Sequence, residues 1–183
     1  MVNEDGCIRP GTSLEGLSGL KPAFGGSVTA GTASPLTDGS AAVLVCTEEF
    51  ARSHGMKILA RIKEVAVAGC PPEIMGMGPL YATRKVLQRA GLSIGDIDLV
   101  ELNEAFASQS IACVRELGLD MAKVKVNLDG GAMAMGHPLG ATGARITGKA
   151  ASLLKRTGGR YAIAAQCIAG GQGIATLLEA VED

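Results

Sequence analysis

His137, one of only two histidines in the chain, lies in the glycine-rich stretch GGAMAMGHPLGATGAR, residues 130–145. Glycine lets the backbone approach a ligand closely, and Pro138 favours the start of a helix directly after the histidine. The positive end of that helix would disfavour imidazolium, so we expect a neutral imidazole. Such a group can donate a hydrogen bond to a developing oxyanion or accept a proton from a thiol. A purely structural histidine is the alternative.

Cys167 is the second candidate, because it ends the apolar run RYAIAAQC and precedes the glycine-rich IAGGQG. Strand ends beside such turns are common catalytic positions in α/β folds. A free thiol has a pKa of about 8.5, close enough to neutrality for proton transfer in either direction. Cys46 and Cys113, in contrast, are expected to be small buried hydrophobic residues.

Asn103 is the third candidate, at the start of NEAFA, where a predicted strand meets a predicted helix. Its amide could hold a water molecule or a substrate oxygen. It could also simply cap the helix. The spacing leaves both roles open.

A possible phosphate-binding loop, GARITGKA at residues 143–150, is rejected. Ala150 stands where a P-loop needs a hydroxyl for Mg²⁺. The stretch is also expected inside a helix, whereas a P-loop joins a strand to a helix.

The composition argues against several other functions. The formal net charge is -1 and the 17 Lys and Arg residues are scattered, so nucleic acid is a poor candidate partner. No stretch approaches the ~18 apolar residues that a membrane span needs. Five cysteines without a C-x-x-C pair predict neither a disulfide framework nor a metal site, and they favour the reducing cytoplasm.

Strands alternate with helices after a loop-like start over residues 1–36, which predicts an α/β domain. Helices are expected over residues 47–55, 78–91, 104–118 and 138–159. Strands are expected over residues 41–46, 57–69, 96–102, 124–129, 160–168 and 173–181.

Several motifs together resemble the thiolase superfamily, specifically the acyl-CoA thiolases. They are VTAGTASPLTDGSAAVL, MGMGP, LVELNEAFA, GGAMAMGHPLGATGAR and CIAGGQG, in the order and spacing of that family. The resemblance implies the carboxy-terminal α/β half of a thiolase, with a mixed sheet flanked by helices. Residues 1–36 would be a remnant of the loop domain, 37–56 the last strand and helix of the amino-terminal domain, and 57–183 the carboxy-terminal domain.

The resemblance further implies a thioester Claisen reaction, run as condensation or as thiolysis of a 3-oxoacyl-CoA, with coenzyme A thioesters as substrates and neither cofactor nor metal. His137 would activate a nucleophilic cysteine and bind the thioester oxygen, together with a water held by Asn103. Cys167 would move a proton on and off the α-carbon, and the N–H of Ala169 would help to form a second oxyanion hole. The implied substrate-binding residues are Ser34, Met75 and Phe106.

The sequence departs from the family pattern in three places. Ala169 replaces a common glycine and would be strained at positive φ. Thr32 replaces a common asparagine, which we expect to matter little. The C-x-S type motif with the nucleophilic cysteine is absent, and the other cysteines match non-catalytic segments. We therefore expect a chain that is inactive alone, is active only when joined to or assembled with the missing amino-terminal half, and forms homo-oligomers. The alternative is a scaffold or binding subunit.

Overall fold

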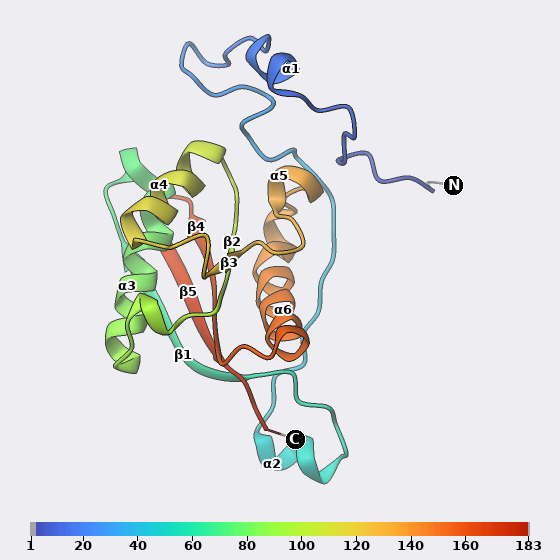
Figure 1. The fold of residues 1–183 in the computed structure, drawn as a ribbon, viewed down its shortest axis with the longest axis vertical. Coiled ribbons are helices and arrows are strands. Elements are labelled where there is room, and N and C mark those ends of the chain that lie inside the picture. The colour runs from blue at the N-terminus through green and yellow to red at the C-terminus, as the bar shows by residue number, and fades with distance from the viewer. Residues whose placement is uncertain (1–2, 183) are drawn as a thin grey trace.

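The computed structural model describes residues 3–182 and has a five-stranded mixed sheet at its centre (Figure 1). Residues 1, 2 and 183, the outer ends of the first and last predicted segments, lie outside the described residues. The strand order is β1-β5-β4-β2-β3. The strands are β1 (Arg61–Gly69), β2 (Leu99–Leu102), β3 (Lys125–Val126), β4 (Tyr161–Ile168) and β5 (Gln172–Glu179). The predicted α/β class with a mixed sheet is confirmed.

The direction of the strands determines where the site can form. β2 pairs in parallel with both β3 and β4, whereas β5 is antiparallel to its neighbours β4 and β1. Parallel neighbours end at the same edge of a sheet, and loops at that edge commonly carry the site in α/β folds. Asn103 directly follows β2, and Cys167 lies near the end of β4. The sheet topology therefore brings these two segments to one edge.

Helices cover both faces of the sheet and give it two apolar layers (Figure 1). On one side α3 (Gly78–Ala90) and α4 (Ala107–Leu117) pack on a cluster that includes Ile163 and Leu177. On the other side α6 (Leu139–Thr157) packs through Leu153 and Leu154. The shorter elements nearby are the 3-10 helices η1 (Pro72–Met77) and η2 (Ile94–Asp96) and the helix α5 (Ala132–Met135). The stretch from Gly143 to Ala150, which the sequence analysis rejected as a P-loop, lies inside α6 as predicted.

The predicted strand over residues 41–46 is wrong. This segment is extended but belongs to no strand, and Leu44 and Val45 are 74% and 66% exposed. It runs along the outside of α6, where a Cβ at Gly148 would lie 3.0 Å from the Val43 Cγ1 (Figure 1). Within residues 3–182 it pairs with no strand, so its apolar side chains stay exposed. Cys46 is exposed for the same reason, contrary to expectation, whereas Cys113 is buried as predicted.

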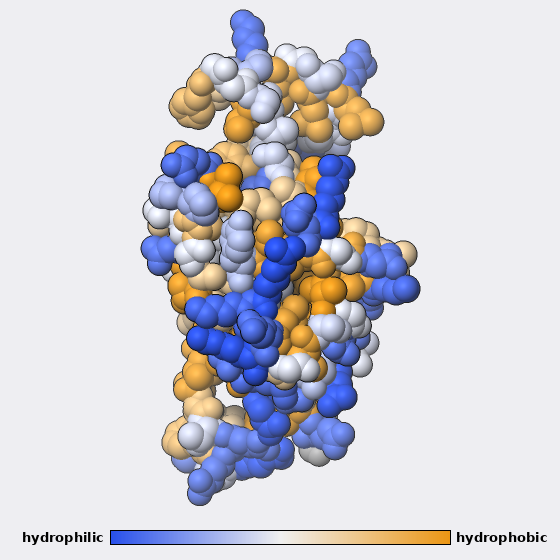
Figure 2. Space-filling model, turned by 90° about the vertical axis from the view of Figure 1, so that its left-hand side faces the viewer, coloured by the Kyte–Doolittle hydropathy of each residue, from blue (hydrophilic) through white to orange (hydrophobic). Residues whose placement is uncertain are grey.

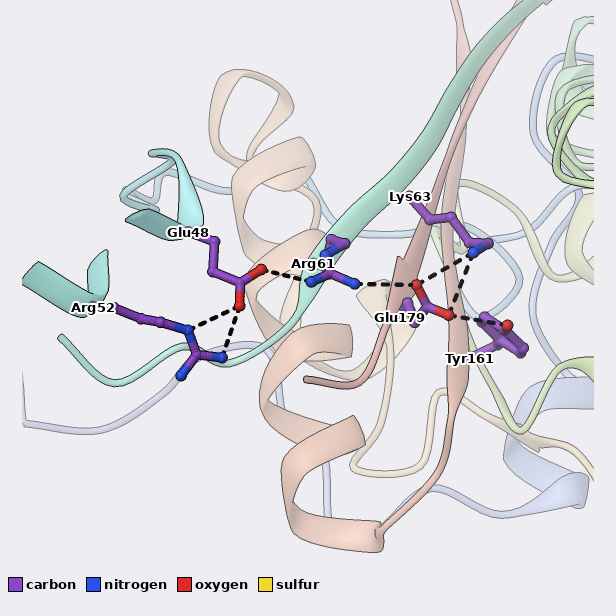
Figure 3. A network of polar contacts seen from close by, with 6 residues as sticks. All are labelled: Glu48, Arg52, Arg61, Lys63, Tyr161 and Glu179. Carbon is purple, nitrogen blue, oxygen red and sulfur yellow. Dashed lines mark hydrogen bonds and ion pairs between the residues drawn. The ribbon is translucent and has the colours of Figure 1, made fainter. Parts of the chain in front are cut away.

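Helix α2 (Glu48–Ser53) follows, as predicted, with the Thr47 hydroxyl accepting a hydrogen bond from the Phe50 N–H. A polar network joins this helix to the sheet (Figure 3). Arg61 on β1 bridges Glu48, at 2.6 Å, and Glu179 on β5, at 3.7 Å. Glu179 also accepts a hydrogen bond from the Tyr161 hydroxyl at 3.0 Å. The link is polar and largely exposed, unlike the apolar contacts within the sheet.

The first part of the chain, around α1 (Leu14–Ser18), also keeps apolar side chains at its surface. Leu14 is 86% exposed and Phe24 is fully exposed. Figure 2 shows apolar residues at the top of the molecule, the end where Figure 1 places α1. No helix within residues 3–182 is both long and apolar enough to cross a membrane.

Candidate functional site

Two of the predicted site residues are in direct contact. The Asn103 Nδ2 lies 3.3 Å from the His137 Nε2, although 34 positions separate the two residues in the chain. Asn103 follows β2, and His137 lies in the short loop between α5 and α6. The contact depends on how these loops pack at the end of the sheet.

Asn103 does not cap the following helix. Helix α4 begins at Ala107, and its N-cap residue Phe106 makes no side-chain cap hydrogen bond. Asn103 is only 1% exposed, and its Oδ1 has no hydrogen-bond partner within residues 3–182. An unpaired buried carbonyl is costly, so its retention favours a role in binding over a role in capping.

His137 is half-buried, and its pKa is lowered mainly by burial and also by the positive charge of Arg145. The direction is the expected one, but these causes differ from the helix terminus that the sequence suggested. Pro138 is the N-cap residue and not the first helical residue, so α6 begins one residue later than predicted. On the far side of the ring, the His137 Nδ1 lies 2.7 Å from the Thr142 Oγ1. Both ring nitrogens therefore have protein partners.

Glu104, which the sequence analysis missed, joins the Asn103 loop to the His137 loop. Its Oε2 accepts a hydrogen bond from the Met133 N–H at 3.0 Å, and its Oε1 accepts one from the Asn127 Nδ2 at 2.8 Å. The Asn127 side-chain amide also accepts a hydrogen bond from the Leu102 N–H and donates one to the Leu102 carbonyl, each at 2.9 Å. It thus pairs with the end of β2 as the backbone of a neighbouring strand would. A Cβ at Gly131 would collide with the Glu104 carboxylate, so a side chain there would displace this carboxylate from its partners. The sequence feature that could have identified Glu104 is its charge, because the surrounding loop has few charged residues.

Cys167 lies on β4, the strand that pairs with β2, and its backbone is close to that of Asn103. The Asn103 N–H donates to the carbonyl of Ala165, two residues before Cys167, at 2.9 Å. Burial raises the pKa of the Cys167 thiol. Among the described residues, no hydrogen bond joins that thiol to Asn103 or His137. The structure thus brings His137 and Asn103 into contact and places Cys167 on β4, the strand next to β2.

Ala169 is free of the backbone strain that the sequence raised as a possibility. The positive φ angles of the turn between β4 and β5 lie at Gly170 and Gly171, at 82° and 87°. Ala169 is exposed and does not have positive φ. The substitution is therefore accommodated without distortion.

The predicted substrate-binding residues lie in two places. The N–H of Ser34 donates to the Ala105 carbonyl at 3.0 Å, and Ala33 forms a β-bridge with Phe106. Ser34 therefore lies against the NEAFA segment, to which Phe106 belongs. Met75 lies in η1, which packs against α4.

An open pocket of about 420 Å³ lies directly beside the His137 loop. It is lined by residues 37–41 and by residues 138–141 at the start of α6. Gly136 has a φ of 98°, and a Cβ there would collide with Thr37, so glycine allows the two walls to approach. Within residues 3–182, no group of three or more His, Cys, Asp or Glu side chains could hold a metal ion.

Comparison with known proteins identifies the family. A model described as the thiolase C-terminal domain matches residues 56–180, and one described as the thiolase N-terminal domain matches residues 1–49. The chain belongs to the thiolase family. Among curated thiolases, the 3-ketoacyl-CoA thiolases of Aliivibrio fischeri and Vibrio parahaemolyticus are 53% and 55% identical to it, over 98% and 97% of this chain.

Solved thiolase structures share the fold. The acetyl-CoA acetyltransferase of Bacillus anthracis superposes with a TM-score of 0.91 at 48% identity, over 97% of this chain and 45% of that one. A human mitochondrial 3-ketoacyl-CoA thiolase in complex with CoA gives 0.88 at 43%, over 99% and 46%. The chain spans about half the length of the curated thiolases it matches, 47% of the Aliivibrio protein and 46% of the Vibrio protein.

Proposed function

We propose that this chain supplies part of the active site of an acyl-CoA thiolase, which condenses thioesters or cleaves a 3-oxoacyl-CoA by thiolysis. The observation that carries the proposal is the contact between Asn103 and His137, in loops that Glu104 holds together. The nucleophilic cysteine is supplied by a segment outside these 183 residues, in the same polypeptide or in a partner chain. Family membership and the CoA complex of a thiolase relative support coenzyme A thioesters as substrates.

His137 acts first, on the nucleophile. Burial and Arg145 lower the pKa of its imidazole and favour the neutral form, so Nε2 can accept the proton of a cysteine thiol. In condensation the thiolate attacks the thioester carbonyl, and the bond from that carbon to coenzyme A breaks, which releases coenzyme A as its thiolate. The imidazolium then donates a hydrogen bond to the thioester oxygen. A water bound to the Asn103 amide donates a second one. Donors placed before the charge develops stabilise it without reorganisation.

Cys167 acts second, on the α-carbon. Because burial raises its pKa, the group rests as a thiol and can protonate the leaving enolate in thiolysis. In condensation the thiolate removes the α-proton, while His137 and the water bound to Asn103 donate to the enolate oxygen, and the N–H of Ala169 helps to form the second oxyanion hole. An enolate needs such a donor because the α-proton of a thioester is only weakly acidic.

Ser34, Met75 and Phe106 bind the pantetheine arm and the acyl group. The position of Ser34 against the NEAFA segment, which contains Phe106, supports this assignment. The exposed apolar segment 41–46 supports pairing with an amino-terminal half, and its exposure in this chain favours self-association when that half is absent.

The test is acetoacetyl-CoA thiolysis by the chain alone and after mixing with a separately produced amino-terminal thiolase half. We expect no turnover alone, turnover after assembly, and a loss of 100-fold or more, roughly, on His137→Ala or Cys167→Ala. Cys7→Ala, at a half-buried cysteine outside the site, is the matched control and should retain activity.

Two outcomes would contradict the proposal. Turnover by the chain alone that is lost on Cys167→Ala would show that no second half is needed. An assembled complex that stays inactive would favour the scaffold or binding role instead, and co-elution in size-exclusion chromatography establishes whether assembly occurred.

A further inference from the structure

We infer that Thr142 is a positioning residue that holds the neutral His137 ring in its Nδ1–H tautomer, with the Nε2 lone pair directed to the Asn103 side. The inference concerns how the histidine is prepared. Its meaning for catalysis rests on the proposed function, whereas the tautomer itself can be measured without any activity.

The hydrogen bonds of the Thr142 hydroxyl determine the tautomer. The hydroxyl lies 2.7 Å from the His137 Nδ1 and 3.1 Å from the Pro138 carbonyl. A hydroxyl has one hydrogen to donate, and a carbonyl oxygen can only accept. If the hydrogen is directed to the Pro138 carbonyl, the Thr142 oxygen accepts at its other contact. The hydrogen of that contact must then belong to the His137 Nδ1.

Helix geometry favours this direction of donation. Thr142 lies in the first turn of α6, and its hydroxyl bonds to the carbonyl four residues earlier, a frequent contact of threonine in helices. Thr142 is fully buried, so no solvent competes for its hydroxyl. The helix therefore fixes the rotamer and the lone pair that faces the ring.

The Asn103 side of the ring agrees with the same tautomer. The Asn103 Nδ2 is a donor and lies 3.3 Å from the His137 Nε2, which must then be the unprotonated nitrogen. Donation runs in one direction, from the Asn103 amide through the imidazole and the Thr142 hydroxyl to the Pro138 carbonyl. The opposite tautomer requires the hydroxyl to turn to Nδ1 and the buried amide to reverse.

The consequence for the chemistry is that the basic nitrogen faces the site before any substrate binds. An Nε2 lone pair can accept a thiol proton directly, whereas an Nε2–H tautomer must first exchange its proton. Replacement of the Thr142 hydroxyl by a methyl group leaves a buried Nδ1–H without an acceptor, which disfavours this tautomer. Serine keeps the hydroxyl and should preserve the arrangement.

The experiment is nitrogen-15 NMR of the imidazole in the full chain. The chain has only two histidines, so His54→Gln, on the exposed end of α2, leaves His137 as the single signal. At a pH above the imidazole pKa, we expect a pyrrole-type Nδ1 and a pyridine-type Nε2. Thr142→Ser should retain this pattern, and the nearly isosteric Thr142→Val should shift the population toward Nε2–H.

The inference is overturned if the chain with threonine at 142 shows the Nε2–H tautomer, or if Thr142→Val folds and keeps the original pattern. Circular dichroism establishes folding of the variant, and the spectrum of the unsubstituted site remains decisive if valine unfolds it. In an assembled enzyme, Thr142→Val should lower kcat roughly 10-fold or more with little change in KM, and serine should restore it. The expected tautomer in an assembly without turnover would contradict the proposed function and leave this inference intact.

Discussion

Residues 3–56 and residues 57–182 both contain short apolar runs, but the two regions bury them to very different extents. In the second region, Tyr161, Ile163 and Ala165 of β4 are at most 6% exposed. In the first region, Ala51 is the single buried residue among those described. The run AAVLVC is as apolar as β4, yet it remains at the surface. Apolar composition therefore sets the tendency to be buried, and the presence of neighbouring strands decides whether burial happens.

The two regions differ in burial because they contact different sides of α6. One side packs on the sheet through Leu153 and Leu154, and the extended segment 41–46 runs along another. The curated thiolases that match are about twice as long as this chain. We propose that chain beyond these 183 residues supplies the strands with which this segment pairs.

Hydrogen exchange should show the largest contrast between the two regions. We expect amides of residues 41–46 to exchange at least roughly 1,000-fold faster than those at the centre of β4, because local opening costs range from near zero to the full unfolding free energy. Mass spectrometry of peptic fragments measures both segments in one sample. Comparable protection in the two would contradict the contrast, and added amino-terminal half should protect residues 41–46.

The same substitution in each region should give the next largest difference. Leu177→Ala removes a fully buried side chain from β5 and should lower the free energy of unfolding by about 2–5 kcal/mol. Leu44→Ala, at a 74% exposed side chain, should change it by less than about 0.5 kcal/mol. Urea unfolding measures both variants. Equal losses would show that the exposed segment is packed in solution.

A buried carboxyl in the second region should make stability depend on pH. Burial raises the pKa of Glu101 from 4.5 to about 7. The folded state holds the proton of Glu101 more tightly than the unfolded state does. The contribution of the protonated carboxyl to the free energy of unfolding is therefore fully present below about pH 4.5 and is lost as the pH rises from there through 7. At 1.36 kcal/mol per pKa unit, the loss reaches about 3 kcal/mol.

Glu101→Gln should therefore be more stable than the unsubstituted chain at high pH and similar to it at low pH. Thermal unfolding across that range measures the difference. Glu73→Gln, at an exposed carboxyl in η1, is the control and should leave the profile nearly unchanged. If Glu101→Gln does not stabilise the chain at high pH, the prediction is wrong, because the charged carboxylate is then well accommodated in the folded state.

The smallest effect should come from the polar link between the two regions. Glu48→Gln weakens the bridge from α2 to Arg61 and should slightly increase hydrogen exchange in α2 while leaving β4 unaffected. Exposed ion pairs contribute little because solvent screens them. Glu49→Gln, on the next residue of the same helix, is the comparison. An effect that spreads into β4 would mean that the two regions unfold together.

Much of the second region could be predicted because its signals are local. The glycines at the ends of α3 and α4, Gly91 and Gly118, adopt the left-handed conformation that ends a helix. Residue type and spacing were enough to propose candidate site residues, but the contact between Asn103 and His137 could not be predicted from them. The predicted burial of Cys46 was wrong because burial depends on whether another part of the chain packs against the segment. Glu104 could not be identified because its partners Asn127 and Met133 are far away in the chain.

The sequence by itself determined where the helices and most strands form, because capping residues, glycine stops and apolar periodicity act within a few residues of one another. It also determined which side chains could do chemistry. Only the tertiary structure decided that Asn103 contacts His137 rather than capping α4, and that residues 41–46 form no strand. Those outcomes depend on hydrogen-bond partners and strand neighbours from distant parts of the chain, and no local pattern encodes them.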